Sequence, residues 1–111
     1  MTTRTENVFS IAEKVLGCKW MLQILHHISK NVNRPSALER AIPGLTTKVL
    51  NERLRTLLRF GILEKNSFRE SPPRVEYRLT RFGRRLVSIL EQLEALQHEI
   101  ARSNSEQRRS S

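Results

Sequence analysis

Hydrophobic and polar positions alternate with helical spacing over most of this 111-residue chain, and each such stretch predicts a helix. The predicted helices cover residues 10–17, 19–29, 36–42, 46–60 and 80–102. Ser10 and Ser36 each stand three residues before a Glu, the pattern of a capping box that opens a helix. Thr46 and Thr80 are expected to cap the fourth and fifth helices.

The predicted helix over 46–60 is the most clearly amphipathic segment, and Gly61 is expected to end it. Its apolar side carries Val49, Leu50, Leu54 and Leu57. Its polar side carries Lys48, Asn51, Glu52, Arg55 and Arg59. Arg53 falls on the apolar side, where we expect a structural contact of this side chain rather than a solvent-exposed charge.

Two short strands are expected after this helix, over residues 62–66 and 75–79. The second alternates cleanly between apolar and polar residues. Pro72 and Pro73 lie between the strands and exclude a tight two-residue turn, so we expect a hairpin with a longer loop.

The last predicted helix carries apolar residues that step by 4, 3, 4, 3 and 4, the spacing of a heptad seam. These residues are Phe82, Leu86, Ile89, Leu93, Leu96 and Ile100. The first half of the seam has the core of its own domain to cover, whereas the second half has little left in the chain to pack against. Leu93, Leu96 and Ile100 are therefore candidate contacts with a partner helix, and Leu86 of the first half is counted with them as a dimerisation residue.

The order of these elements predicts an α+β, mostly helical fold: a winged helix-turn-helix with a two-stranded wing and a long C-terminal dimerisation helix. The helix at 36–42 would brace the reading helix at 46–60, and Pro43 to Leu45 would form the turn between them. We divide the chain into a flexible N-terminus (1–7), this DNA-binding domain with its dimerisation helices (8–102) and a disordered polar tail (103–111).

The charge of the chain is strongly basic and unevenly distributed. The formal net charge is +9, and fifteen of the twenty basic residues are Arg, whose planar guanidinium suits phosphates and base edges. Residues 46–90 hold eleven of the twenty basic and four of the eleven acidic residues, a local excess of +7. This concentration favours nucleic acid as the partner, with an anionic membrane surface as the second choice.

The candidate DNA contacts lie on the reading helix and on the wing. They are Thr46, Thr47, Lys48, Asn51, Arg55, Arg59, Arg69 and Arg74. The alternative for the helix residues is an ordinary solvated face, and the alternative for the two wing arginines is a mobile loop that contacts nothing.

Several other classes of protein are not expected. Cys18 is the single cysteine, so no intrachain disulfide can form and a reducing, cytoplasmic location is expected. No apolar run reaches the length of a membrane span, and the polar start lacks the apolar region of a signal peptide.

A metal site, a cofactor and a catalytic function are not expected either. His26 and His27 are adjacent and would point about 100° apart on a helix, and His98 is remote in sequence. The chain has no Asp, no phosphate-binding glycine motif and no evident nucleophile–base arrangement.

Three sequence strings carry a resemblance to a known family: Gly17-Cys18-Lys19-Trp20, Pro43-Gly44-Leu45-Thr46 and Pro72-Pro73-Arg74-Val75-Glu76-Tyr77. With the Leu-Thr pair and the Gly-Arg pair that follow the third string, the chain resembles the HxlR-type winged-helix transcriptional regulators of bacteria and archaea from about Val8 to Leu96. The resemblance implies a homodimer joined through the first and last helices, with Val8 in the interface. It also implies recognition by the helix at 46–60 and wing contacts near Arg74.

Three positions depart from the family pattern. Asn7 and Val8 occupy the place of a Cys-Pro pair whose Cys serves some members as a redox switch. Cys18 replaces the second Gly of a Gly-Gly-Lys-Trp string, and Pro35 stands where an aromatic residue is usual. The family's redox switch is therefore not expected here.

The sequence as a whole predicts a sequence-specific regulator of transcription that binds double-stranded DNA as a homodimer. Two alternatives stay open: a winged-helix module that binds a protein partner, and a non-specific architectural DNA binder.

Overall fold

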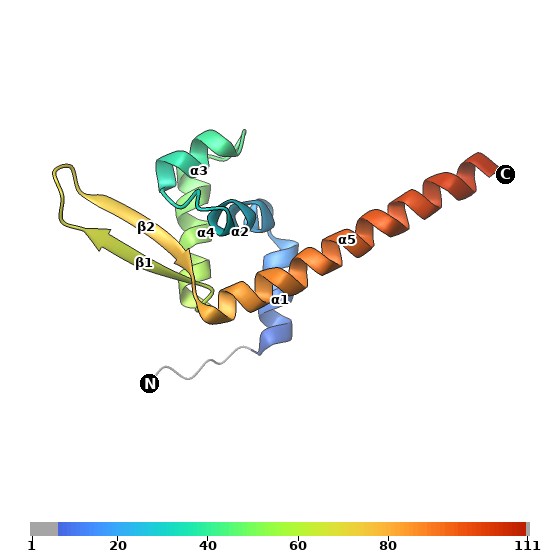
Figure 1. The fold of residues 1–111 in the computed structure, drawn as a ribbon, viewed down its shortest axis with the longest axis horizontal. Helices are drawn as coiled ribbons and strands as arrows, with labels where there is room; N and C mark the ends of the chain where they lie inside the picture. Colours follow the sequence, from blue (N-terminus) through green and yellow to red (C-terminus); the bar gives the residue numbers. More distant parts are fainter. Residues whose placement is uncertain (1–6, 111) are drawn as a thin grey trace.

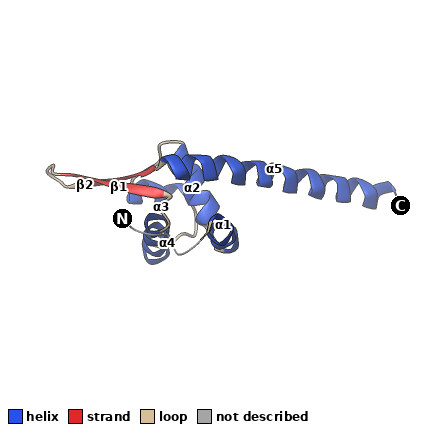
Figure 2. Ribbon diagram, turned by 90° about the horizontal axis from the view of Figure 1, so that it is seen from below, coloured by secondary structure: helices blue, strands red, loops and turns tan. Residues whose placement is uncertain are grey.

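The computed structural model describes residues 7–110 and contains five helices and one antiparallel β-ribbon within that range (Figure 1). In chain order the elements are α1 (Val8–Gly17), α2 (Met21–Ser29), α3 (Pro35–Ala41), α4 (Thr47–Arg59), β1 (Leu63–Phe68), β2 (Arg74–Leu79) and α5 (Arg81–Ser110). The ribbon and α5 extend in opposite directions, and α1 and α4 pack on one side of them (Figure 2). The molecule is therefore elongated, with extents of 62 × 34 × 21 Å. The mostly helical α+β winged helix-turn-helix predicted from the sequence is confirmed.

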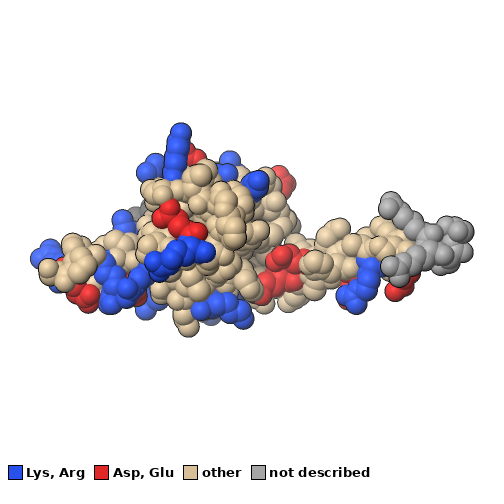
Figure 3. All heavy atoms as spheres, turned by 90° about the horizontal axis from the view of Figure 1, so that it is seen from above, with Lys and Arg blue, Asp and Glu red and all other residues tan. Residues whose placement is uncertain are grey.

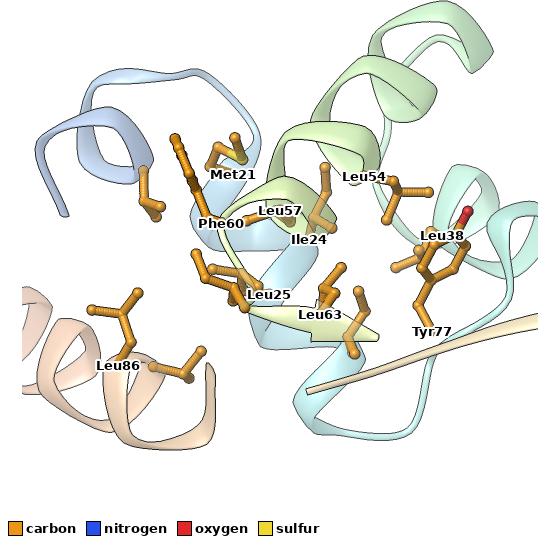
Figure 4. Close-up of a cluster of buried hydrophobic side chains, with 14 of the residues drawn as sticks. Met21, Ile24, Leu25, Leu38, Leu54, Leu57, Phe60, Leu63, Tyr77 and Leu86 are labelled. Carbon is orange, nitrogen blue, oxygen red and sulfur yellow. The ribbon is translucent and has the colours of Figure 1, made fainter. Parts of the chain in front are cut away.

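The hydrophobic core lies where α2 meets α4, the ribbon and the first part of α5 (Figure 4). Met21 and Leu25 of α2, Leu54 and Leu57 of α4, and Leu86 of α5 are all buried. A buried side chain of this size contributes about 1.5–3 kcal/mol to folding. Helix α2 contacts α1, α3, α5 and β2, so it lies at the centre of the fold.

The wing is attached to the loop that precedes α3. In the ribbon Leu63 pairs with Leu79 at the base and Phe68 pairs with Arg74 at the far end. The backbone N–H of Tyr77 donates to the carbonyl of Asn33 at 2.9 Å, outside the ribbon ladder. Burial of the Tyr77 ring raises the pKa of its phenol above the ordinary value of 10.0.

The start of α5 is fixed to the segment that joins α4 to β1. The Thr80 hydroxyl donates to the carbonyl of Gly61 at 2.5 Å and accepts from the N–H of Gly83 at 3.0 Å, which confirms Thr80 as the helix cap. The backbone N–H of Thr80 donates to the carbonyl of Ile62 at 3.0 Å. A Cβ atom on Gly83 would overlap that carbonyl oxygen, so only glycine permits this close approach.

Two predicted capping boxes are wrong. Helix α1 is capped by Asn7, whose side-chain oxygen accepts from the N–H of Ser10 at 2.9 Å, so the helix begins before Ser10. Helix α3 begins at Pro35, and Ser36 lies inside its first turn. Proline already has the φ of a helix and needs no amide partner at this position, which explains a start without a side-chain cap.

Two helix boundaries also differ from prediction. Helix α2 begins at Met21 rather than Lys19, because Trp20 adopts a left-handed backbone with φ of 77°. Helix α5 continues to Ser110, where the sequence predicted a disordered tail after Arg102. No Gly or Pro follows Arg102 to stop the helix, and several good helix formers do follow. Of the predicted flexible N-terminus, residues 1–6 lie outside the described residues.

Candidate nucleic-acid interface

Helix α4 separates its buried and exposed residues as the sequence predicted. Leu50, Leu54 and Leu57 are buried, which turns the opposite face of the helix outward. All six predicted contact residues on or before this helix are exposed: Thr46, Thr47, Lys48, Asn51, Arg55 and Arg59. The helix therefore presents polar and cationic side chains over its whole length.

The N-terminus of α4 is held by two threonine hydroxyls. The Thr46 oxygen accepts from the N–H of Val49 at 3.2 Å, which confirms Thr46 as the cap. The Thr47 hydroxyl donates to the carboxylate of Glu39 on α3. Thr47 therefore joins the two helices of the motif, and Glu39 is a positioning residue that the sequence analysis assigned only to a capping box.

Two arginines of α4 have contacts within the protein. The Nε of Arg53 donates to the carbonyl of Lys19 at 3.0 Å, which confirms the structural contact expected for this residue. The Arg59 guanidinium lies 5.5 Å from the centre of the neighbouring Phe60 ring. Among the predicted arginines of this helix, Arg55 has the most direct path to a ligand, because it is exposed and Arg59 is partly held by its neighbour.

The two predicted wing arginines differ in their surroundings. Arg69 lies exposed next to Phe68, the last residue of β1. Arg74 begins β2, and its guanidinium lies 4.3 Å from the centre of the Phe68 ring. Its Nε lies 3.2 Å from a carboxylate oxygen of Glu76, and its Nη2 lies 3.3 Å from Glu70.

A third arginine connects this cluster to the helix-turn-helix. Arg34 immediately precedes α3, and its Nε lies 3.5 Å from the same Glu76 oxygen that pairs with Arg74. Glu76 therefore bridges the wing and the start of α3. The sequence analysis missed Arg34, Glu70 and Glu76, and the signal that was available is the alternation of β2, which places residues 74 and 76 on one face of the strand.

Basic side chains project from the wing and from the helical domain in the space-filling view, with acidic side chains among them at the wing (Figure 3). The part of α5 that leaves the domain shows fewer basic atoms in this view. The local excess of positive charge thus accompanies the elements predicted to meet DNA, and Glu52, Glu70 and Glu76 reduce it locally.

The predicted dimerisation residues divide into two groups. Val8, Leu93, Leu96 and Ile100 are large apolar side chains that are 45–51% exposed. Leu86 is only 3% exposed and belongs to the core of its own chain, so its assignment to a partner contact is corrected. Three further large apolar side chains, Phe9, Leu16 and Ile89, are exposed on α1 and α5; the sequence analysis placed Ile89 on the seam but chose none of the three as a dimer contact.

None of the helices between residues 7 and 110 is long and apolar enough to cross a membrane. Over the same range, His, Cys and Glu side chains form no group of three or more that could hold a metal ion.

Comparison with known proteins gives a consistent family match. Residues 15–105 match the model of a family described as HxlR-like helix-turn-helix. The HTH-type transcriptional regulator YtcD of Bacillus subtilis is 39% identical over 80 residues, which cover 72% of this chain and 64% of YtcD. The match thus spans less than two thirds of that relative's length.

Solved structures match over more of their length. A structure described as a MarR-family transcriptional regulator from Enterococcus faecalis has a TM-score of 0.80 and 33% identity, over 96% of each chain. A structure of the HTH-type regulator ytcD has a TM-score of 0.76 and 33% identity, and covers 87% of this chain and 99% of that one.

Proposed function

The chain belongs to the HxlR-like helix-turn-helix family, and from this membership we propose that it is a regulator of transcription that binds specific sites on double-stranded DNA as a homodimer. The observation that carries the proposal is the exposed polar and cationic face of α4, opposite the buried Leu50, Leu54 and Leu57. We propose a cytoplasmic location, where DNA is accessible, and no catalytic activity.

In this proposal α4 enters the major groove. The groove is about 12 Å wide and accepts one α-helix, which a second helix must hold in place across the backbone. The Thr47–Glu39 contact supports α3 in that bracing role. Lys48, Asn51 and Arg55 then lie on the face that meets base edges and phosphates, and Thr46 and Thr47 keep their hydroxyls on the protein.

The wing supplies the second set of contacts. Arg69 is exposed, so it is the wing residue best placed to contact phosphate without any rearrangement. Arg74 is already paired with Glu70 and Glu76, and its contact with DNA requires the loss of one of these partners. Arg59 lies at the end of α4 and is proposed to contact the backbone.

The homodimer is proposed to form through the exposed apolar side chains of α1 and of the outer half of α5. Val8, Leu93, Leu96 and Ile100 would each lose contact with water in a dimer, which favours association. A two-fold axis would place the two α4 helices in successive major grooves, about 34–36 Å apart, at a pseudo-palindromic site.

The experiment that tests this function is selection of bound duplexes from a random pool by the purified chain, followed by affinity measurements on the selected site. Arg55→Ala should weaken binding to the selected site by roughly 1–3 kcal/mol if Arg55 contacts a base. Arg102→Ala is the matched control, because it removes the same charge from an exposed position on the far part of α5, and it should leave affinity nearly unchanged. An equal loss on selected and random duplexes would make Arg55 a phosphate contact.

Salt dependence gives an independent test. Affinity should fall steeply as salt rises, in proportion to the number of phosphates that Lys and Arg neutralise. Binding that selects no sequence would support an architectural DNA binder instead. A chain that binds no duplex even at low salt would support a protein-interaction module and contradict the proposal.

A further inference from the structure

The guanidinium of Arg74 has one edge fixed within the wing and one edge at its surface. Its Nε is buried and lies 3.2 Å from a carboxylate oxygen of Glu76, an ion-pair distance without hydrogen-bond geometry, and its plane lies against Phe68. Its Nη2 lies 3.3 Å from Glu70, whose side chain is 51% exposed, compared with 22% for Glu76. The Glu76 contact is therefore the structural one, and the Glu70 contact is the one that an external group can replace.

A hollow of about 470 Å³ opens at this outer edge, between the wing loop and the start of α3. Arg74 and Glu70 line it from the wing, and Arg34 lines it from the segment before α3. Arg34 and Arg74 carry two positive charges that Glu70 and Glu76 balance, so the cluster has no net charge while Glu70 stays paired. Without Glu70, the cluster holds two guanidinium charges and one carboxylate charge, so an anion in its place would face a local excess of one positive charge.

We propose that Glu70 occupies the place of a DNA backbone phosphate in the free protein, and that phosphate displaces its carboxylate from Nη2 of Arg74 when DNA binds. A phosphate oxygen and a carboxylate oxygen offer the same acceptor geometry to a guanidinium, so one can replace the other without moving the rest of the wing. Glu76 and Phe68 keep the guanidinium oriented during the exchange. This inference rests on the proposed DNA-binding function and assigns the wing a contact that the free protein keeps masked.

The test uses the full chain and a random-sequence duplex at low salt. Glu70→Gln removes the competing charge, and an exposed ion pair is weak enough that affinity should rise about three- to fivefold. Glu64→Gln is the matched control: Glu64 lies on the same wing, its side chain is also 51% exposed, and it pairs with Arg78 at 3.5 Å. This control should tighten binding by less than about twofold, which measures the general effect of removing one negative charge from the wing.

A second comparison assigns the effect to Arg74. In a chain that already carries Arg74→Gln, the further substitution Glu70→Gln should change affinity by less than about twofold, because the guanidinium for which Glu70 and phosphate compete is gone. The proposal is overturned if Glu70→Gln tightens binding no more than Glu64→Gln, if it weakens binding, or if its gain persists without Arg74. Each of these three outcomes would leave the DNA-binding function standing, because the wild-type chain still binds duplex. A wild-type chain that binds no duplex would overturn both the inference and the proposed function.

Discussion

The two halves of α5 share one helix and one apolar spacing but lie in different surroundings. Between residues 81 and 90, Gly83, Leu86, Val87 and Leu90 are buried against the domain. From residue 91 to 107 every side chain is exposed, including Leu93, which lies seven residues after the buried Leu86, and the seam residue Ile89 of the inner half is exposed as well. The difference teaches that a heptad seam identifies an apolar face but does not tell which molecule covers it.

The largest effect should come from Gly83, where the inner half of α5 meets the carbonyl of Ile62. Gly83→Ala forces the helix away from that oxygen, so we expect the free energy of unfolding to fall by more than about 3 kcal/mol in urea denaturation. Gly17→Ala is the control, since a Cβ at the end of α1 meets no atom within 4 Å and its backbone is helical. Equal stability of the two variants would contradict the close approach at Gly83.

The next effect separates the two halves directly. Leu90→Ala removes a side chain that is 1% exposed and should lower the free energy of unfolding by about 2–4 kcal/mol. Leu93→Ala, three residues further along, removes one that is 45% exposed. Measured at concentrations where the chain is monomeric, Leu93→Ala should cost less than about 0.5 kcal/mol. A similar cost at both positions would show that the outer half packs on its own domain.

The third effect concerns association rather than folding. Replacing both Leu93 and Leu96 with Lys places charges on the exposed stripe, and the proposed dimer should then dissociate in sedimentation experiments. Loss of the second half-site contact should weaken affinity for a two-fold site by at least about tenfold, or 1.4 kcal/mol. Unfolding by urea should stay close to that of the wild-type monomer. A dimer that survives both substitutions would assign the interface to another surface.

The smallest effect is expected at the far end of the helix. A chain that ends after Arg102 loses only the last turns of α5, whose described side chains are exposed. Its free energy of unfolding should change by less than about 0.5 kcal/mol, and its oligomeric state should be unchanged. A loss of dimer in this variant would extend the contact surface beyond Ile100.

The sequence predicted the elements whose signals are local. The amphipathic spacing of α4, the caps Thr46 and Thr80, and the alternation of β2 each depend on residues within a few positions of one another, and all three agree with the structure. The capping box predicted at Ser10 was wrong because a second local signal competes with it. Asn7 caps the helix one turn earlier, and residue spacing alone does not decide between the two caps.

The contacts between elements could not be predicted in this way. Glu39 with Thr47, and Glu76 with Arg34, join residues that are separated in sequence and meet only after folding. The assignment of Leu86 to a dimer failed because the number of heptad turns that the domain itself covers depends on the position of α2. The exposed polar face of α4 was predictable, whereas the pairing of Glu76 with Arg34 across two elements was not.

Thr80 and Gly83 attach the base of α5 to Gly61 and Ile62, so a small tilt at this base becomes a larger displacement at the far end of the helix. The part of α5 beyond Leu90 is about 30 Å long at the rise of an α-helix, and a tilt of about 5° at its base would move its far end by about 2.6 Å. The base is fixed to the residues that follow α4. In a dimer that forms through the outer parts of the two α5 helices, such a tilt would change the distance between the two α4 helices. In the proposed dimer, a tilt at Thr80 and Gly83 would therefore change the spacing between the two halves of the DNA site.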